Sequence, residues 1–452
     1  MNPSIDTVFN VDSESMGREE CFKKVLKSSS FRYLWNMGEK LVVDYVIRNI
    51  DLIVNYGFDK MLSSKVISDI CVSIMKSRST PPFQRIIKES NFLALVEKYP
   101  MSNPNLSIQI ECLYLSVLPF IIIDESNNFR SVFKSEAFIK RILLFQSTGD
   151  VFSFFSLLLT DPNRSTINFL KGSGFLKVLR TYMMSSNDLV SDISLSLFVK
   201  TLSTSLYSDA AMVLLEDDCL NKLVKSVLLD PRTQAFEFLR YTFQTANREY
   251  FFSKWKKIIP IIEIKNSDFC KIVLNSGVYT SCVDACMGLV ISLYEHNHVY
   301  SIDIETITIH LAELFFKYRT NSFLHTTFMR LIQTLQKSKS ITNDLVQKMQ
   351  IVDPMINLFK ERESNFSFSS WGQMRQIAKI INPYISSENR VIWDTVVICN
   401  IDKTDQIIKK NYGGRTLLLP KRLQSSWIVQ ILRILMILLF IFLIYTLVPG
   451  NE

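Results

Sequence analysis

Few side chains in this sequence have the types and spacing that catalysis requires. A hydrolytic dyad would draw first on histidine, and the chain contains His296, His298, His310 and His325. His296 and His298 flank Asn297 in a predicted loop, and no local motif supplies a nucleophile beside them. The sequence also contains no Walker loop, G-x-G-x-x-G, H-E-x-x-H or G-x-S-x-G. We therefore expect surface or packing histidines, and a chain that is not an enzyme and takes no small-molecule substrate.

The cysteines indicate a reducing environment. They are Cys21, Cys71, Cys112, Cys219, Cys270, Cys282, Cys286 and Cys399, scattered through apolar contexts. Cys282 and Cys286 could share one face of a helix, but no second pair of ligands completes a zinc site. We expect reduced core thiols, with no metal and no cofactor.

Two charged clusters have an ordinary structural interpretation. The acidic residues 216–218 precede an apolar segment, where carboxylates favour the positive end of a helix dipole. Trp255 lies among three lysines, which could form an anion site with an aromatic platform. It leads, however, into a run of isoleucines, so a packed tryptophan beside solvated lysines is the simpler prediction.

The C-terminal stretch has the composition of a membrane anchor. Trp427 to Val448 reads WIVQILRILMILLFIFLIYTLV, and as a helix it would span about 33 Å against a hydrocarbon core of roughly 30 Å. Arg433 can extend its side chain to the lipid head groups, and the residues after it, Ile434 to Val448, are all uncharged. The alternative is a buried core helix, which is seldom apolar on every face. We predict a single transmembrane helix over 427–448, followed by a short tail over 449–452.

The charge distribution predicts the orientation of that anchor. Residues 409–452 hold six basic residues and one acidic residue, and the preceding 408 residues hold 45 basic and 42 acidic ones. The basic residues all precede the apolar run, so the positive-inside rule places the N-terminal side in the cytosol. This basic stretch would meet anionic lipid, and a main body so close to neutral gives no indication of nucleic-acid binding.

The two ends of the sequence refine the expected location. Residues 1–16 contain no basic residue and no apolar run of signal-peptide length, so we expect insertion after translation. The residues after the apolar run carry no basic charge, which favours the endoplasmic reticulum over the mitochondrial outer membrane.

Helical periodicity runs through residues 20–400. Apolar residues recur with a 3.6-residue spacing between clusters of Ser, Asn, Asp and Pro. The chain has only 12 glycines and no alternating strand pattern, which argues against an α/β fold. The expected fold class is all-α.

A weak repeat predicts how these helices are arranged. Similar apolar segments begin at Phe92, Phe138, Phe175 and Leu220, and armadillo and HEAT units have periods of about 40 to 47 residues. Ser135, Ser173 and Asp217 are the expected helix caps of such units. We predict an armadillo/HEAT-like α-solenoid over 20–400, between a flexible N-terminus over 1–19 and a basic linker over 401–426. A helical bundle with less regular stacking is the alternative.

Residues 314–382 carry the most distinctive motifs. The segment 314–324 reads LFFKYRTNSFL and is followed by His325; the segments 345–362 (LVQKMQIVDPMINLFKER) and 371–382 (WGQMRQIAKIIN) come after it. In this order they resemble the SAPS-domain family, regulatory subunits of Sit-type, protein-phosphatase-6-like serine/threonine phosphatases. The residues that match its N-N-F-L-H-like core are Phe315, Phe316, Asn321, Phe323, Leu324 and His325, with Ser322 in place of an asparagine.

The resemblance implies a non-catalytic scaffold that holds a serine/threonine phosphatase catalytic subunit, here tethered to a membrane. The six matching residues become candidate partner contacts, with the polar pair Asn321 and His325 favoured and Phe323 expected to leave a cavity on truncation if it is buried. A terminal membrane anchor is not usual in that family. The alternative is a tail-anchored solenoid adaptor for trafficking or tethering partners, unrelated to phosphatases.

Overall fold

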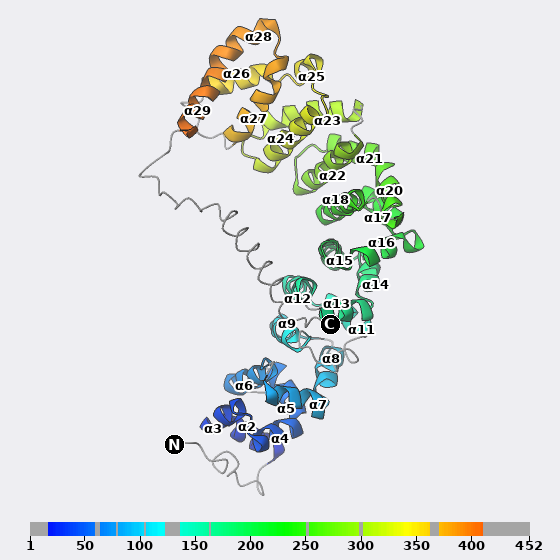
Figure 1. Cartoon of the computed structure of the whole chain (residues 1–452), viewed down its shortest axis with the longest axis vertical. Coiled ribbons are helices and arrows are strands. Elements are labelled where there is room, and N and C mark those ends of the chain that lie inside the picture. Colours follow the sequence, from blue (N-terminus) through cyan, green and yellow to red (C-terminus); the bar gives the residue numbers. More distant parts are fainter. Residues whose placement is uncertain are drawn as a thin grey trace, which may run out of the picture. The chain divides into compact units, whose positions relative to one another are not determined.

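The computed structural model describes residues 17–58, 64–77, 80–103, 105–122, 136–161, 164–249, 253–297, 302–361 and 370–409. Throughout these residues the regular structure is helical and no strand is present, so the all-α prediction is confirmed. The contacts divide the chain into two compact units, Met1–Ser340 and Ile341–Glu452 (Figure 1).

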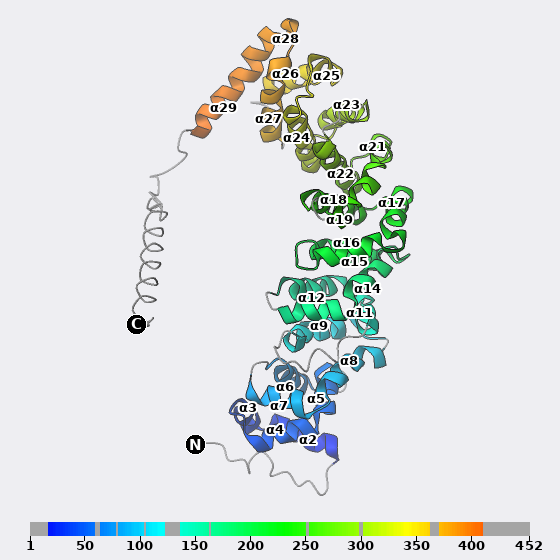
Figure 2. The ribbon, with the colours of Figure 1, turned by 45° about the vertical axis from the view of Figure 1, so that its right-hand side comes forward.

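The first compact unit is built mainly from helix pairs. The first helices of these pairs, here called the first row, are α5 (Ile50–Phe58), α8 (Phe92–Ser102), α11 (Glu136–Leu143), α14 (Phe175–Tyr182), α17 (Cys219–Leu229), α21 (Asn266–Leu274) and α23 (Ile302–Lys317). Their partners, the second row, are α6 (Lys65–Met75), α9 (Ile108–Ile122), α12 (Thr148–Thr160), α15 (Asp188–Thr201), α18 (Thr233–Arg248), α22 (Ser281–Asn297) and α24 (Ser322–Lys337). In the second row every helix contacts the next. Figure 2 shows α9, α12 and α15 stacked in this order, with α11 and α14 beside them.

The pairs recur at a nearly constant interval. The second-row helices begin at residues 65, 108, 148, 188, 233, 281 and 322, so neighbouring starts are 40 to 48 residues apart. The four segments that the sequence pattern singled out lie at the start of α8, α11, α14 and α17. The apolar repeat therefore marks equivalent helices of successive pairs, as predicted.

Shorter helices complete this unit. The N-terminal helices are α2 (Arg18–Lys27), α3 (Ser29–Asn36) and α4 (Lys40–Arg48), and the connecting helices are α7 (Pro81–Glu89), α13 (Arg164–Gly172), α16 (Tyr207–Leu215), α19 (Ser253–Lys256) and α20 (Ile259–Glu263). Helix α16 packs against both α14 and α17, so it mediates the contact between these first-row neighbours.

The pattern of buried positions explains why these helices stack. On α18 the buried side chains Phe236, Leu239, Phe243 and Ala246 recur at intervals of three or four residues and form one apolar face. Helix α22 is buried on more sides, because it packs between α18, α21 and α24. A pair alone could not bury these faces, so each pair depends on its neighbours for a core.

Polar contacts also join successive pairs. Arg141 on α11 donates from Nε to the Pro100 carbonyl (3.0 Å), and Gln244 on α18 donates to the Ser292 hydroxyl on α22 (3.0 Å). Thr327 on α24 donates from Oγ1 to the Asp284 carboxylate on α22 (2.6 Å). The partners are 41 to 48 residues apart in sequence, about one repeat. Such links fix the register between adjacent pairs.

A hydrogen bond between the two helices of one pair compensates for a proline inside a helix. Pro100 has no N–H, so the Val96 carbonyl one turn earlier in α8 loses its helical donor. The buried Tyr114 on α9 donates its hydroxyl to that carbonyl (2.8 Å). Its ring also packs against Phe58 and Tyr99, with centroid distances of 4.9 Å and 6.1 Å. The hydroxyl replaces the missing amide and ties α9 to α8.

Replacing Tyr114 with phenylalanine should lower the free energy of unfolding by about 1 to 3 kcal/mol, because it leaves a buried carbonyl without a donor. Urea unfolding followed by circular dichroism measures the change. Tyr33→Phe, at an exposed tyrosine, is the matched control and should be neutral. Equal stabilities for the two variants would contradict this account.

Two expected helix caps are corrected by the structure. Ser173 is buried and donates to the Leu170 carbonyl (3.0 Å), while Gly174, with φ 69°, occupies the N-cap of α14. The acidic turn η1 (Glu216–Asp218) places Asp217 at φ 51°, and no side-chain cap bond forms at α17. Arg180 instead pairs with Glu216 (3.0 Å) and Asp217 (3.3 Å). These ion pairs join α14 to the acidic turn η1, in which Asp217 has a left-handed backbone conformation. The third expected cap, Ser135, lies outside the described residues.

The second compact unit contains α25 (Asn343–Lys348), α26 (Val352–Lys360), α27 (Trp371–Ile381), η2 (Asn382–Tyr384), α28 (Ser387–Ile392), η3 (Trp393–Ile398) and α29 (Cys399–Lys409). The turn η3 is a π-helix, which inserts the buried Trp393 against α26. The Trp393 indole donates from Nε1 to the Asn382 side chain (3.0 Å). Asp405 pairs with Arg375 and Lys379, so α29 is fixed to α27 and extends into the region expected to be a linker.

The predicted membrane anchor, with Trp427, Arg433, Ile434 and Val448, lies outside the described residues. Among the helices that the structure does describe, none combines the length and the apolar character needed to cross a bilayer.

Candidate partner-binding groove

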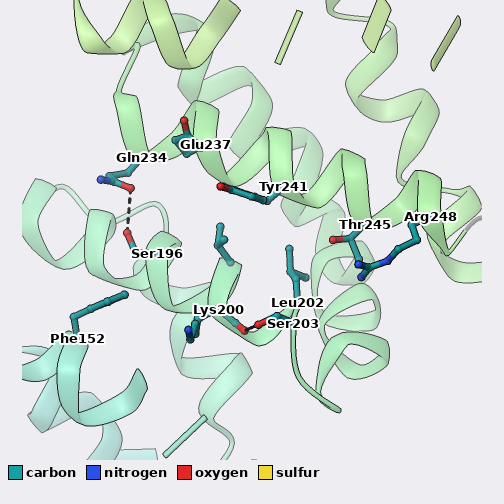
Figure 3. A pocket seen from close by; sticks show the side chains of 11 residues that line it. Phe152, Ser196, Lys200, Leu202, Ser203, Gln234, Glu237, Tyr241, Thr245 and Arg248 are labelled. Atoms are coloured by element: carbon teal, nitrogen blue, oxygen red, sulfur yellow. Dashed lines mark hydrogen bonds between the residues drawn. The ribbon is translucent and has the colours of Figure 1, made fainter. Parts of the chain in front are cut away.

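A groove opens between three consecutive helices of the second row, α12, α15 and α18. Its volume is about 460 Å³, and its apolar lining consists of Phe152, Val199, Leu202 and Tyr241. Phe152 and Tyr241 are 37% and 42% exposed, so two aromatic rings are available to a ligand. In Figure 3, Tyr241 extends from α18 toward α15, and Phe152 lies at the α12 end.

Polar side chains surround this apolar centre. Ser196 on α15 donates from Oγ to Oε1 of Gln234 on α18 (3.1 Å), which joins the two helices at one end of the groove (Figure 3). Thr245 and Arg248 lie at the other end, and Arg248 pairs with Glu249 (3.2 Å). The lining residues of α18 extend from Gln234 to Arg248, about 21 Å along a helix. That length suits a short peptide segment.

Residues behind the groove lining support the Tyr241 ring. Arg240 pairs with Glu237, and its guanidinium lies over the Tyr241 ring at 4.8 Å from the centroid. Gly288 on α22 faces this arginine so closely that a Cβ there would approach Nη1 of Arg240 to 3.1 Å. The absence of a side chain at Gly288 therefore gives Arg240 the space from which it supports Tyr241.

The side chains that line the groove are suited to binding a protein segment. Its lining contains serine and threonine hydroxyls, but among its described side chains no histidine or paired carboxylate stands beside them to activate a nucleophile. The described residues also contain no group of three potential metal ligands. An apolar centre with a polar rim is typical of surfaces that bind protein segments.

The segment predicted to bind a partner forms the junction of α23 and α24, and half of it belongs to the core. Phe315 and Leu324 are fully buried, and Phe316 is half-buried. His325 is also fully buried: its Nε2 donates to the Phe315 carbonyl (3.1 Å) and its ring packs edge-to-face on Phe315 at 4.5 Å. Burial lowers the pKa of His325, against the opposing effect of its backbone hydrogen bonds, and so favours the neutral imidazole.

Asn321 has a structural role at the same junction. Its side chain accepts from the Leu324 amide (3.1 Å) and caps α24, while its Nδ2 donates to the Tyr279 carbonyl (3.4 Å) in the preceding turn. His325 is therefore closed to a partner, whereas Asn321 is partly exposed and its contact with a partner stays a prediction. Their polar groups are used to join α24 to α23 and to its neighbour.

Phe323 is the member of this segment that faces solvent. It is 73% exposed, so the burial on which the expected cavity depended is not met, and its truncation would leave no cavity. Of the six predicted contacts, Phe323 is the best placed to meet a partner. It lies at the start of α24, in the same row as the groove helices but outside the groove lining.

The other sequence candidates have packing roles where the structure describes them. His296 packs edge-to-face on Phe243 at 5.5 Å, and Trp255 is buried, as predicted. Cys282 and Cys286 share α22, and burial raises the pKa of both thiols. Protonated thiols are poor metal ligands. His298 lies outside the described residues.

Sequence reasoning missed the groove itself. Its lining comes from residues 152 to 248, which lie on or next to three separate helices, and no local motif marks them in the sequence. The only available signal was the aromatic residue type at Phe152 and Tyr241, whose exposure the sequence does not show. Periodicity alone does not show which of two apolar residues on neighbouring turns faces outward.

Comparison with known proteins assigns no family. No protein-family model matches the chain, and no curated protein matches it. The crystal structure of SYS-1 is similar at 10% identity and a TM-score of 0.42, over 90% of this chain and 81% of that one. Two engineered proteins have TM-scores of 0.38 and 0.34 at 11% and 12% identity; they cover 86% and 55% of this chain and 97% and 96% of their own lengths. Likenesses at this level carry no argument about function.

Proposed function

We propose that this protein is a non-catalytic scaffold, in which an armadillo-like α-solenoid binds a segment of a partner protein in the groove between α12, α15 and α18. The observation that carries the proposal is the pair of exposed aromatic side chains, Phe152 and Tyr241, in a groove whose walls are joined by the bond between Ser196 and Gln234. Aromatic residues on a preformed surface contribute large contact areas at low entropic cost.

A serine/threonine phosphatase catalytic subunit is the partner that we propose first. Its support is the resemblance of residues 314–382 to SAPS-domain regulatory subunits, in which three motifs occur in the same order. The buried residues of the first motif would act by shaping the junction of α23 and α24. The alternative partner is a trafficking or tethering protein, in which case the chain is an adaptor.

We expect the double substitution Phe152→Ser and Tyr241→Ser to reduce partner capture by about tenfold, because it removes both aromatic anchors of the groove. The full chain should be purified by affinity and its co-purifying proteins quantified by mass spectrometry. The matched control is Leu157→Ser with Met212→Ser, two exposed apolar residues outside the groove, which should capture the partner normally.

Recovery of a phosphatase catalytic subunit with the wild-type chain and the control, but not with the groove variant, would support the full proposal. A well-folded wild-type chain that recovers no such subunit would end the phosphatase proposal in favour of the adaptor. Equal recovery by both variants would exclude the groove as the binding site.

We propose further that residues 427–448 anchor the scaffold in a membrane, with the helical units in the cytosol and the endoplasmic reticulum as the first candidate location. The support is the uncharged run from Ile434 to Val448 and the basic residues that precede it, which would meet anionic lipid. The full-length protein should remain with membranes on alkaline carbonate extraction. Its release into the supernatant would contradict an integral anchor.

A further inference from the structure

A repeated surface feature lies where each first-row helix leads into its second-row partner. Every one of these seven turns, so far as the structure describes them, presents at least one exposed large apolar residue. These residues are Val66, Met101, Ile108, Leu144, Met184, Leu189, Leu229, Val278 and Phe323. The most exposed are Leu229 at 87%, Phe323 at 73% and Leu189 at 64%. We call this set of turns the turn edge.

Hydrogen bonds between neighbouring turns show that the turn edge is continuous over much of its length. Arg141 reaches back to the carbonyl of Asn103, and Arg232 to the hydroxyl of Ser191 (both 3.2 Å). Further links join Thr233 to Ser281 (3.2 Å) and Tyr318 to the Gly277 carbonyl (3.3 Å). Equivalent turns of successive pairs therefore lie side by side. Packed helices are about 8 to 10 Å apart, so the apolar side chains form a line at roughly that spacing.

Some charged groups near the turn edge have compensating neighbours, whereas Arg319 in the last turn is exposed. Arg232 pairs with Asp188 (3.1 Å) and Asp230 (3.6 Å). Asp284 accepts hydrogen bonds from Tyr279 (2.8 Å) and Thr327 (2.6 Å). Serine, asparagine and threonine make up most of the other polar residues of these turns. This composition lowers the cost of bringing the turn edge against a surface of low polarity.

We propose that the turn edge rests on a zwitterionic lipid surface, with its apolar side chains inserted among the head groups. A protein partner of ordinary affinity buries a contiguous area of about 800 Å² per side, which a line of single side chains on separate turns does not offer. A bilayer interface accepts each side chain individually. The inference rests on the proposed membrane anchorage, because the uncharged run from Ile434 to Val448 is what would hold the chain at a bilayer.

Lipid contact places specific residues next to acyl chains. Leu229→Trp and Phe323→Trp should each introduce a tryptophan that brominated phosphatidylcholine quenches, when the full chain is reconstituted into phosphatidylcholine vesicles. Ile264→Trp is the matched control: Ile264 is 79% exposed, but it lies at the end of α20, away from the turn edge. The fluorescence of the wild-type chain is subtracted, because it contains Trp427 and four other tryptophans.

Quenching of both turn-edge tryptophans at least about twofold beyond the control is expected. Quenching equal to the control would overturn the proposal of lipid contact. Carbonate extraction then shows whether the membrane anchor also fails. A chain retained by membranes supports the anchor, whereas a chain released from them contradicts both the anchor and the lipid contact. A concentration-dependent dimer in sedimentation velocity that shields position 229 from quenching would assign the turn edge to a second copy. A bound protein that shields position 229 from quenching would assign the turn edge to a protein partner. Either result overturns lipid contact.

Discussion

Replacing His325 with alanine should lower the free energy of unfolding of the first compact unit by about 3 kcal/mol, whereas Phe323→Ala should change it by less than about 0.5 kcal/mol. The two residues are separated by one position, and a sequence-based preference would rank them in the opposite order. His325 is fully buried, and its imidazole bonds to the Phe315 carbonyl and packs on the Phe315 ring. Its loss leaves a cavity and removes a hydrogen-bond donor from the Phe315 carbonyl.

Urea unfolding of the full chain in detergent, followed by helical ellipticity, measures both variants. His325→Gln serves as a further control, because a neutral amide can still donate to the carbonyl while filling part of the space. It should fall between the wild type and His325→Ala. If Phe323→Ala proves as destabilising as His325→Ala, the placement of α24 against α23 is wrong.

The substitution Leu239→Asp should have a still larger effect, more than about 4 kcal/mol. Leu239 is fully buried on α18, and an aspartate there would place a carboxylate in an apolar core without a partner. Helix α18 contacts α15 and α22 directly, so the damage should extend to the pairs on both sides. Hydrogen exchange followed by mass spectrometry should show lost protection over α15, α18 and α22.

The control for this experiment is on the same helix. Tyr241 is two residues further along and lies in the groove with its side chain partly exposed, so Tyr241→Asp should keep protection in all three helices. It should nevertheless weaken partner capture, because it removes one aromatic anchor. Loss of protection confined to α18 in the Leu239→Asp variant would mean that the pairs do not depend on their neighbours.

The repeat was the part of the fold that could be predicted from the sequence. The segments at Phe92, Phe138, Phe175 and Leu220 lie at the starts of equivalent first-row helices, because every such helix must turn the same apolar face toward its neighbours. The positions of caps were less accessible. Ser173 resembles an N-cap in sequence, but the left-handed Gly174 takes that position and Ser173 bonds back to Leu170.

Candidate contacts were harder to predict, because exposure depends on the neighbouring helix. Asn321 and His325 are polar and flank a turn, which favours a surface position on average. Here the Phe315 carbonyl and the Tyr279 carbonyl supply partners from other segments, and both polar side chains are used internally. Phe323 points the other way for the same reason: its neighbours Leu324 and His325 occupy the buried face of α24.

The spacing of the second-row helices has a consequence for how this chain is synthesised. Because a pair buries its core against the next pair, and the next pair ends 38 to 49 residues later, each pair can fold once that much more chain has left the ribosome. At translation rates of about 5 to 20 residues per second, this delay is about 2 to 10 seconds. Contacts between distant parts of the sequence are not needed, so the first compact unit can be completed in order from its N-terminal end while synthesis of the second is still under way.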